Sequence, residues 1–266
     1  MTLTPTIDHV VINVRDAMDA AAARFTELGF ALTPRGHHTL GSINHLAMFG
    51  TDYLELIGAP PAASRQDLLG WPLGLNGIVF ASESAAATEQ ALTQAGVAHE
   101  QPGNFSRPVT TPHGPRDARF TTVRLPNDTT AAGRLYFCQH HTRDLVWDDA
   151  WRSHPNGAIG VAEVLVAARD PARLGALFAR MFGERAVGRV VGGVRLKAGL
   201  ADIMVLDHAV VAARVGGDAG PDPAREEVMA ALVLRVTDLA ATRAVLGGRD
   251  RVGPEEGFGA TLMFRE

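Results

Sequence analysis

Short runs of apolar residues recur four times along the chain, and a helical pattern follows each of them. The first run covers residues 7–14, and its counterparts begin near Gly77, Glu163 and Ala231. Counted from His9, the successive spacings are 68, 86 and 68 residues. Two equal spacings on either side of a longer one predict two pairs of one repeated unit.

Helix signals after these runs define the unit. After the first run, Asp16 can cap a helix whose apolar stripe ends before Gly29. After the third, Asp170 and Pro171 can begin a helix that ends at Gly183. Short strand-like runs, separated by Gly, Asn, Asp or Pro, come after each helix. The pattern therefore predicts an α+β fold of four βαβββ units.

Alternating positions in the leading strands predict what each face of a sheet contacts. In the first strand, Val10, Ile12 and Val14 share a uniformly apolar face, which we expect to lie under the helices. The opposite face is more mixed, as in a wall that lines a pocket. Pairing the units predicts two modules, residues 1–145 and 158–266. The polar, aromatic connection between them holds two of the three tryptophans, so we expect it to be ordered.

Composition narrows the class of protein. The chain has 266 residues, of which 46% are hydrophobic and 20% charged, with a net charge of −4. It has no basic field to attract nucleic acid or an anionic membrane. Lys197 is the only lysine, and we interpret the scattered arginines as a coding bias and not as a phosphate-binding device. No apolar run reaches the roughly 18 residues that span a bilayer.

The number of cysteines and the N-terminal sequence bear on where in the cell the protein is found. Cys138 is the only cysteine, which excludes intrachain disulfides and a cysteine-rich zinc site. A single thiol suits a reducing cytoplasm, and the N-terminus has no secretory signal pattern. We therefore expect a cytoplasmic protein. The oligomeric state is open, with a homodimer as one alternative.

Two polar residues within apolar strands are the strongest chemical signals. His9 lies in the first strand, and Glu55 lies at the centre of the strand-like run 53–57. A lone carboxylate between leucines is costly to bury without a partner. Its structural alternative is an ion pair with an arginine such as Arg107 or Arg116. The structural alternative for His9 is a strand histidine that is hydrogen-bonded within a polar pocket.

Three segments resemble the vicinal oxygen chelate superfamily, and within it the glyoxalase-like domain proteins. They are Ile7-Asp8-His9-Val10-Val11, Tyr53-Leu54-Glu55-Leu56-Ile57 and Phe137-Cys138-Gln139-His140-His141. The resemblance implies two tandem glyoxalase-like modules. In each, two units pair, their sheet curves into a cup, and a divalent metal binds inside it. The ligands would come from the first and last strands of each unit.

Carried over to this chain, the resemblance implies that His9 and Glu55 bind the metal, with Glu55 also acting in catalysis. Gly77 takes the place of a second histidine and cannot be a ligand. Imidazole and carboxylate groups suit Zn, Ni, Fe, Mn or Co. Open positions on such a metal let a substrate with two adjacent oxygens chelate it.

The third ligand depends on the register of the run 137–141. Aligning it with the run around Glu55 places Gln139 inward as a metal ligand. A shift of one residue would turn Cys138 and His140 inward instead.

Three further residues are candidates for substrate binding. Asn13 shares the mixed face of the first strand, and His141 shares the expected inward face of Gln139. His45 comes near Glu55 if the hairpin turn between their strands has three residues, and a slip of one residue removes it.

The leading hypothesis is a metal-dependent lyase, isomerase or related enzyme, a dioxygenase included, that acts on a small oxygenated metabolite in the cup of the first module. The alternative is a metal-free protein that binds and sequesters a small molecule, as drug-binding members of the superfamily do. In the second module, Glu163 replaces the histidine and Ala231 offers no ligand. We therefore expect that module to be a degenerate, structural copy.

Overall fold

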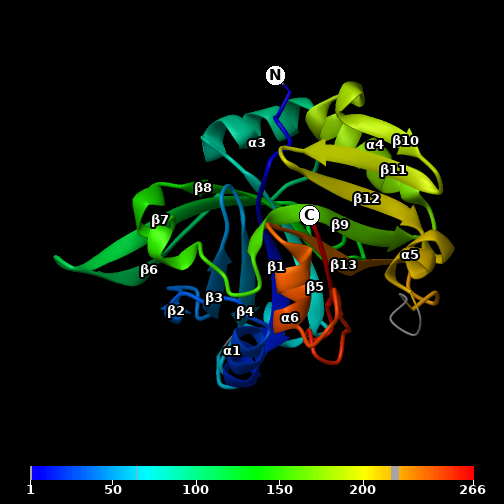
Figure 1. Cartoon of the computed structure of the whole chain (residues 1–266). Helices are drawn as coiled ribbons and strands as arrows, with labels where there is room; N and C mark the ends of the chain where they lie inside the picture. Colours follow the sequence, from blue (N-terminus) through cyan, green and yellow to red (C-terminus); the bar gives the residue numbers. More distant parts are fainter. Residues whose placement is uncertain (1, 64, 217–221) are drawn as a thin grey trace.

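In the computed structural model, the chain folds into two mixed β-sheets of eight and seven strands (Figure 1). The structure describes residues 2–63, 65–216 and 222–266. Strands before the connection at residues 141–157 build the first sheet, and strands after it build the second. The predicted α+β fold of two tandem glyoxalase-like modules is thus confirmed.

The first sheet has the strand order β2-β3-β4-β1-β5-β8-β7-β6. Its strands are β1 (Ile7–Arg15), β2 (Gly36–His37), β3 (Ile43–Met48), β4 (Tyr53–Gly58), β5 (Gly74–Ala81), β6 (Gly103–Thr111), β7 (Gly114–Arg124) and β8 (Arg134–His140). The helices of this module are α1 (Met18–Glu27), α2 (Gln66–Leu69) and α3 (Ala85–Gln94). Strands β1 and β5 are antiparallel neighbours at its centre, and β4 and β8 pair with them in parallel.

The second sheet has the order β10-β11-β12-β9-β13-β15-β14. Its strands are β9 (Ala158–Ala168), β10 (Val187–Val190), β11 (Gly193–Ala198), β12 (Ala201–Asp207), β13 (Glu227–Val236), β14 (Arg251–Val252) and β15 (Thr261–Arg265). Its helices are α4 (Pro171–Phe182), α5 (His208–Val215) and α6 (Leu239–Val245). The first three units are βαβββ, whereas the fourth is βαββ. Gly- and Pro-rich turns occupy residues 253–260, so the fourth unit is one strand short.

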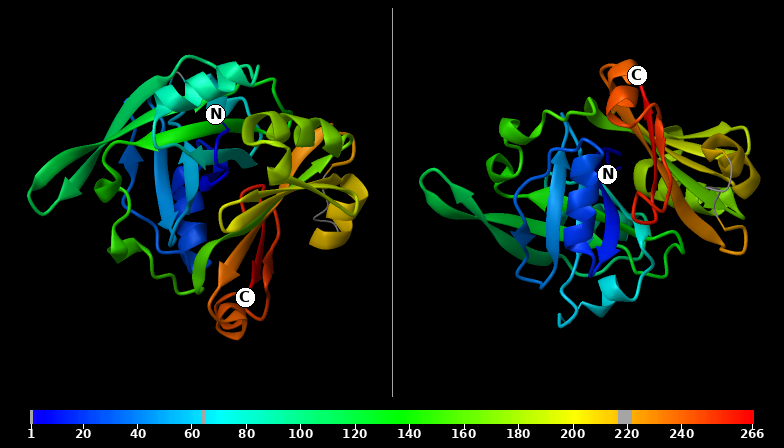
Figure 2. Two further views of the ribbon diagram at one scale, coloured as in Figure 1. Left: turned by 90° about the horizontal axis from the view of Figure 1, so that it is seen from above. Right: turned by 60° about the horizontal axis from the view of Figure 1, so that its bottom comes forward.

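One apolar core joins the two modules. The predicted helix-facing residues Val10, Ile12 and Val14 belong to it, together with residues from β9 and β13. Phe182 of α4 packs against Phe80 of β5, with ring centroids 4.9 Å apart. The left view of Figure 2 shows α3 (turquoise) and α4 (yellow-green) near each other. Separate apolar clusters line the concave faces of the two sheets.

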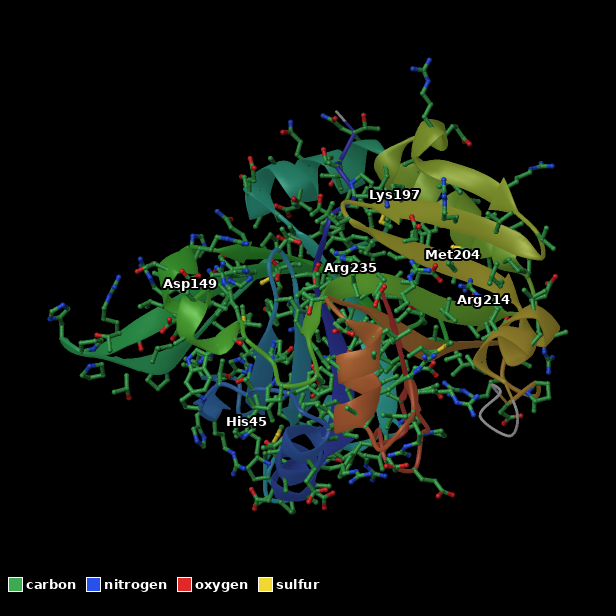
Figure 3. The ribbon with its side chains drawn as sticks, in the orientation of Figure 1. His45, Asp149, Lys197, Met204, Arg214 and Arg235 are labelled. Carbon is green, nitrogen blue, oxygen red and sulfur yellow. The ribbon has the colours of Figure 1, made fainter. Side chains whose placement is uncertain are left out.

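Helix α5 packs against the concave face of the second sheet. Val211 and Val215 are buried there in one cluster with Leu165 and Ala231. Arg214, on the same helix, forms an ion pair with Glu163 of β9 (Figure 3). The residue at the position of His9 is thus neutralised by arginine, which favours a structural role for this module.

Asp52 connects the modules at the turn between β3 and β4. Its carboxylate accepts a hydrogen bond of 2.9 Å from the Val161 backbone N–H of β9. Burial raises the pKa of this carboxyl group to about 6. The folded state therefore holds this proton more tightly than the unfolded chain does, and stability falls as the pH rises from about 4 through about 6.

We expect Asp52→Asn to remove this pH dependence. The amide keeps an oxygen for the Val161 N–H and carries no charge to desolvate. At pH 7.5 the variant should be more stable than the wild type by about 1–3 kcal/mol, and near pH 4 the difference should vanish. Urea unfolding at several pH values measures it. A difference that does not change with pH would contradict the prediction.

Candidate functional site

A bulge in β1 brings two successive side chains to the concave face of the first sheet. The register with β5 shifts between Ile7 and His9, so that Asp8 is the extra residue. Asp8 and His9 are 2% and 3% exposed. A regular strand would have turned them to opposite faces.

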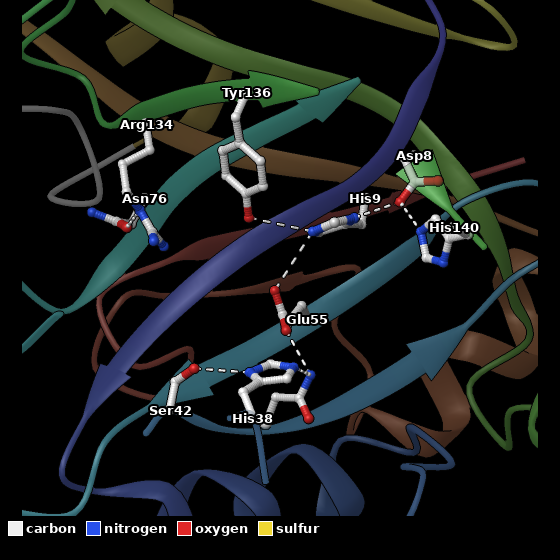
Figure 4. A network of polar contacts seen from close by, with 10 residues as sticks. Asp8, His9, His38, Ser42, Glu55, Asn76, Arg134, Tyr136 and His140 are labelled. Carbon is white, nitrogen blue, oxygen red and sulfur yellow. Dashed lines mark hydrogen bonds and ion pairs between the residues drawn. The ribbon is translucent and has the colours of Figure 1, made fainter. Parts of the chain in front are cut away.

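Asp8 lies between two histidines. Its Oδ2 accepts hydrogen bonds from His9 Nδ1 at 2.7 Å and from His140 Nε2 at 3.0 Å (Figure 4). Burial by itself would raise the pKa of Asp8, but the bonds from His140 and His9 hold it well below its ordinary value. Asp8 is therefore an anion that fixes the tautomer of His9, with the proton on Nδ1 and a free lone pair on Nε2.

His9 Nε2 points into the cup. It lies 3.6 Å from Glu55 Oε2 and 3.4 Å from the Tyr136 hydroxyl. The ring of Tyr53 stacks on the imidazole at 4.4 Å and restricts its rotation. An imidazole nitrogen, a carboxylate oxygen and a phenol oxygen, from β1, β4 and β8, therefore converge on one point.

Glu55 is held from its other side by a polar chain. Its Oε1 accepts a hydrogen bond of 2.6 Å from the amide of Asn44, which also contacts His38 Nε2 at 3.3 Å. His38 Nδ1 lies 2.8 Å from the Ser42 hydroxyl. Burial lowers the pKa of His38 to about 4 against the attraction of Glu55, so this imidazole is neutral at pH 7. The charge of Glu55 is thus left for a ligand.

The cavity around these groups combines polar and apolar walls. It spans about 560 Å³ of space between protein atoms, part of it open to solvent. The apolar residues of its wall are Leu40, Leu46, Tyr53, Ile57, Phe105, Phe120 and Val146. Four arginines also line it, namely Arg65, Arg107, Arg124 and Arg134.

The structure corrects the prediction for Gln139. Its amide oxygen accepts a hydrogen bond of 2.9 Å from the Ala85 backbone N–H at the start of α3, on the helix side of the sheet. Strand β8 therefore has the alternative register, in which Cys138 and His140 face the cup. The choice of alignment caused the error, because a strand that slips by one residue exchanges its faces.

His45 also lies outside the cavity. The turn between β3 and β4 has four residues, not three, and Leu46 pairs with Glu55. His45 consequently faces the helix side, where Nδ1 lies 2.8 Å from the Thr33 carbonyl oxygen (Figure 3). The predicted position of His45 near Glu55 in the cavity is therefore wrong.

Asn13 and His141 lie at the margins. Asn13 is on the concave face as predicted, but its amide donates to the carbonyl oxygen of Leu68 at 2.9 Å, so it anchors α2. His141 is exposed at the end of β8, where Nε2 lies 2.7 Å from the Thr121 hydroxyl. Neither side chain lines the cavity.

A second group of donor atoms lies beside the first. Ligand atoms of Asp8, Cys138 and His140 all lie within 4.8 Å of one another, so they could hold a metal ion. Burial raises the pKa of the Cys138 thiol well above its ordinary value, so without a metal the sulfur stays protonated. Asp8 already accepts bonds from both histidines. This group is therefore the weaker of the two candidates.

Comparison with known proteins agrees with the fold. Residues 7–182 match the family described as "Glyoxalase-like domain". The match covers the first module and reaches the end of α4, and the chain belongs to this family. No curated protein matches the sequence. Among the described residues, no helix is long and apolar enough to cross a membrane.

Solved structures share the fold at low sequence identity. A hypothetical protein from Staphylococcus aureus has a TM-score of 0.68 and 11% identity, with 98% of each chain covered. A fusion of a xylose isomerase-like TIM barrel with 4-hydroxyphenylpyruvate dioxygenase has a TM-score of 0.57 and 16% identity, over 94% of this chain and 40% of that one. A mutant of 4-hydroxymandelate synthase from Streptomyces coelicolor has a TM-score of 0.56 and 13% identity, over 95% and 78%.

Proposed function

We propose that the first cup is the active site of a metal-dependent lyase or isomerase that acts on a small oxygenated molecule. The single observation that carries this proposal is the approach of His9 Nε2 and Glu55 Oε2 to 3.6 Å, from strands that are 46 residues apart in sequence. Both atoms face one cavity, and the spacing suits two ligands of one ion.

The residues present fit a divalent cation. His9 and Glu55 would hold it, with the Tyr136 oxygen as a third contact, and Asp8 would orient His9 from behind. By their ligand chemistry, the suitable metals are Zn, Ni, Fe, Mn and Co. When bound, such an ion supplies Lewis-acid stabilisation of negative charge on substrate oxygens.

Proton transfer suits this site better than oxygenation. A dioxygenase site with two histidines and a carboxylate would need a histidine at position 77. This chain has Gly77 there, and a Cβ would stand 3.0 Å from Val11 Cγ2, a tight contact that the Val11 side chain would have to relieve. The set is therefore one histidine and one carboxylate.

Two side chains, those of Glu55 and Tyr136, could carry out the proton transfer. Glu55 can accept a proton from a carbon next to a substrate oxygen and return it to the product, since Asn44 holds its other oxygen in place. Burial raises the pKa of Tyr136, so its hydroxyl stays protonated and can donate a hydrogen bond to that substrate oxygen.

Metal analysis of the native protein tests the proposal. Protein purified without added metal should contain about one divalent ion per chain, and a chelator should remove it together with any lyase or isomerase activity. If the protein contains no stoichiometric ion and takes none up when metal is added, the alternative function, a metal-free protein that binds a small molecule, is favoured.

A homodimer and a cytoplasmic location stay predictions from the sequence.

A further inference from the structure

Two buried arginines of the first cup are not fully paired with other groups among the described residues. Arg107 and Arg134 are only 6% and 5% exposed. Arg134 Nε donates a hydrogen bond of 2.7 Å to Asn76 Oδ1, but its Nη2 is buried and has no partner within the part of the chain that the structure describes. A buried guanidinium with an unused donor is costly unless something else accepts from it.

Arg107 is the second unpaired cation. Among the described residues, no hydrogen bond or ion pair involves its side chain, although it lies deep in the same cavity. Burial lowers the pKa of Arg107 and also that of Arg134, which shows how strongly both are desolvated. Gly36 leaves the space for the Arg107 stem, since a Cβ there would stand 2.9 Å from its Cδ.

The other two arginines differ in their partners. Arg124 lies over the ring of Tyr136, 5.1 Å from the centroid, and lines the same cavity. Arg65 is paired with Asp67 and contributes little free charge. Three guanidinium groups, those of Arg107, Arg124 and Arg134, therefore face a cavity in which Glu55 is the one carboxylate among the described lining residues. A divalent metal would increase this excess of positive charge.

We propose that Arg107 and Arg134, supported by Arg124, form a subsite for a carboxylate group of the substrate. This proposal deepens the proposed function, because it names the chemical class of molecule that the same cup accepts. A guanidinium matches a carboxylate with two parallel hydrogen bonds, and the unused Nη2 of Arg134 is available for one of them. Figure 4 shows Arg134 on the far side of Tyr136 from His9.

The spacing along β8 sets the size of the substrate. Arg134 and Tyr136 are two residues apart on one face of this strand, a separation of about 7 Å. A substrate would therefore place its carboxylate beside the arginines and its other oxygens near His9 and Glu55, with a few carbon atoms between them. The stacked rings of Phe105 and Phe120, whose centroids are 4.9 Å apart, form an apolar wall of the cavity.

Binding of benzoate to chelator-treated protein tests the subsite without the metal. Calorimetry would compare benzoate with its neutral analogue benzamide, on the wild type and on Arg107→Met and Arg134→Met. We expect each substitution to weaken benzoate binding at least about tenfold and to leave benzamide unchanged. Arg116→Met, an exposed arginine of β7 paired with Asp144, is the matched control and should bind benzoate as the wild type does.

Three results would overturn the proposal. In the first, the wild type binds neither benzoate nor benzamide at millimolar concentration. In the second, it binds both with equal affinity, and in the third, the arginine variants bind benzoate as tightly as the wild type does. Binding of inorganic phosphate in preference to benzoate would replace the carboxylate with a phosphate. Since Arg107 has no protein hydrogen bond to lose, its variant decides the question if Arg134→Met does not fold. His9→Ala should still bind benzoate, so a failure of the metal proposal is distinguishable from a failure of this one.

Discussion

Glu55→Gln will lower the affinity of the protein for a divalent metal by more than about a hundredfold, the upper end of the loss seen for outer-shell partners of metal ligands. The amide keeps an oxygen for the Asn44 hydrogen bond, so the fold of β3 and β4 should persist. What disappears is the negative charge 3.6 Å from His9 Nε2. Metal content after dialysis and a competition titration with a coloured chelator measure the effect.

Variants of the neighbouring donor group serve as the control. Cys138→Ser and His140→Ala each change one of the three donors in the group of Asp8, Cys138 and His140. If the ion binds between His9 and Glu55, the serine variant should keep it, and the alanine variant should lose no more than the contribution of a supporting hydrogen bond. Retention of metal by Glu55→Gln, with loss in Cys138→Ser, would move the metal site to Asp8, Cys138 and His140.

Glu227→Ala will destabilise the junction of the two modules by about 2–4 kcal/mol. Glu227 is 1% exposed, pairs with Arg173 of α4 and accepts a hydrogen bond of 3.0 Å from the Ala131 backbone N–H of the first module. The Thr130 hydroxyl also donates to it. Removal of the carboxylate leaves these donors without an acceptor. Urea unfolding followed by circular dichroism gives the change in free energy.

The neighbouring residue offers a matched control for this prediction. Glu226 carries the same charge one position earlier but is exposed, so Glu226→Ala should change stability by less than about 0.5 kcal/mol. Glu227→Gln, which keeps an acceptor for Ala131, should fall between the two. Equal stabilities of Glu227→Ala and Glu226→Ala would show that the buried carboxylate adds nothing to the junction.

The repeat pattern was sufficient to predict the fold. Equal spacings and helix signals such as Asp170-Pro171 gave four units in two modules, and the face of Val10, Ile12 and Val14 lies against the helices as expected. These features depend on periodicity, which tolerates errors of one or two residues. The missing strand in the fourth unit depends on turn chemistry between β14 and β15 that the repeat does not reveal.

The positions of the site residues depend on the register of the strands, which the sequence predicted less well than the fold. The convergence of His9 and Glu55 was expected, but Gln139 and His45 were placed on the wrong faces by slips of one residue in β8 and in the turn before β4. Asp8 faces the cup only because β1 has a bulge, and no residue pattern in the sequence predicts that bulge. Tyr136 had a signal that was not used: it holds, in the second unit, the position of Glu55 in the first.

The arginines illustrate a different limit. In the sequence they are scattered, and we interpreted them as a coding bias. The fold gathers Arg107 from β6, Arg124 from β7 and Arg134 from β8 around one cavity. Such a cluster depends on long-range pairing of strands, so charge counts along the chain cannot detect it.

The presence of α5 in the second concave face makes the two halves of the chain unequal in capacity. Val211 and Val215 are buried there against residues of the sheet such as Leu165 and Ala231. Within residues 2–63, 65–216 and 222–266, only the N-terminal half has a cup with the polar groups described above. We therefore expect one equivalent of ligand to saturate the chain, and its signal to report on that half.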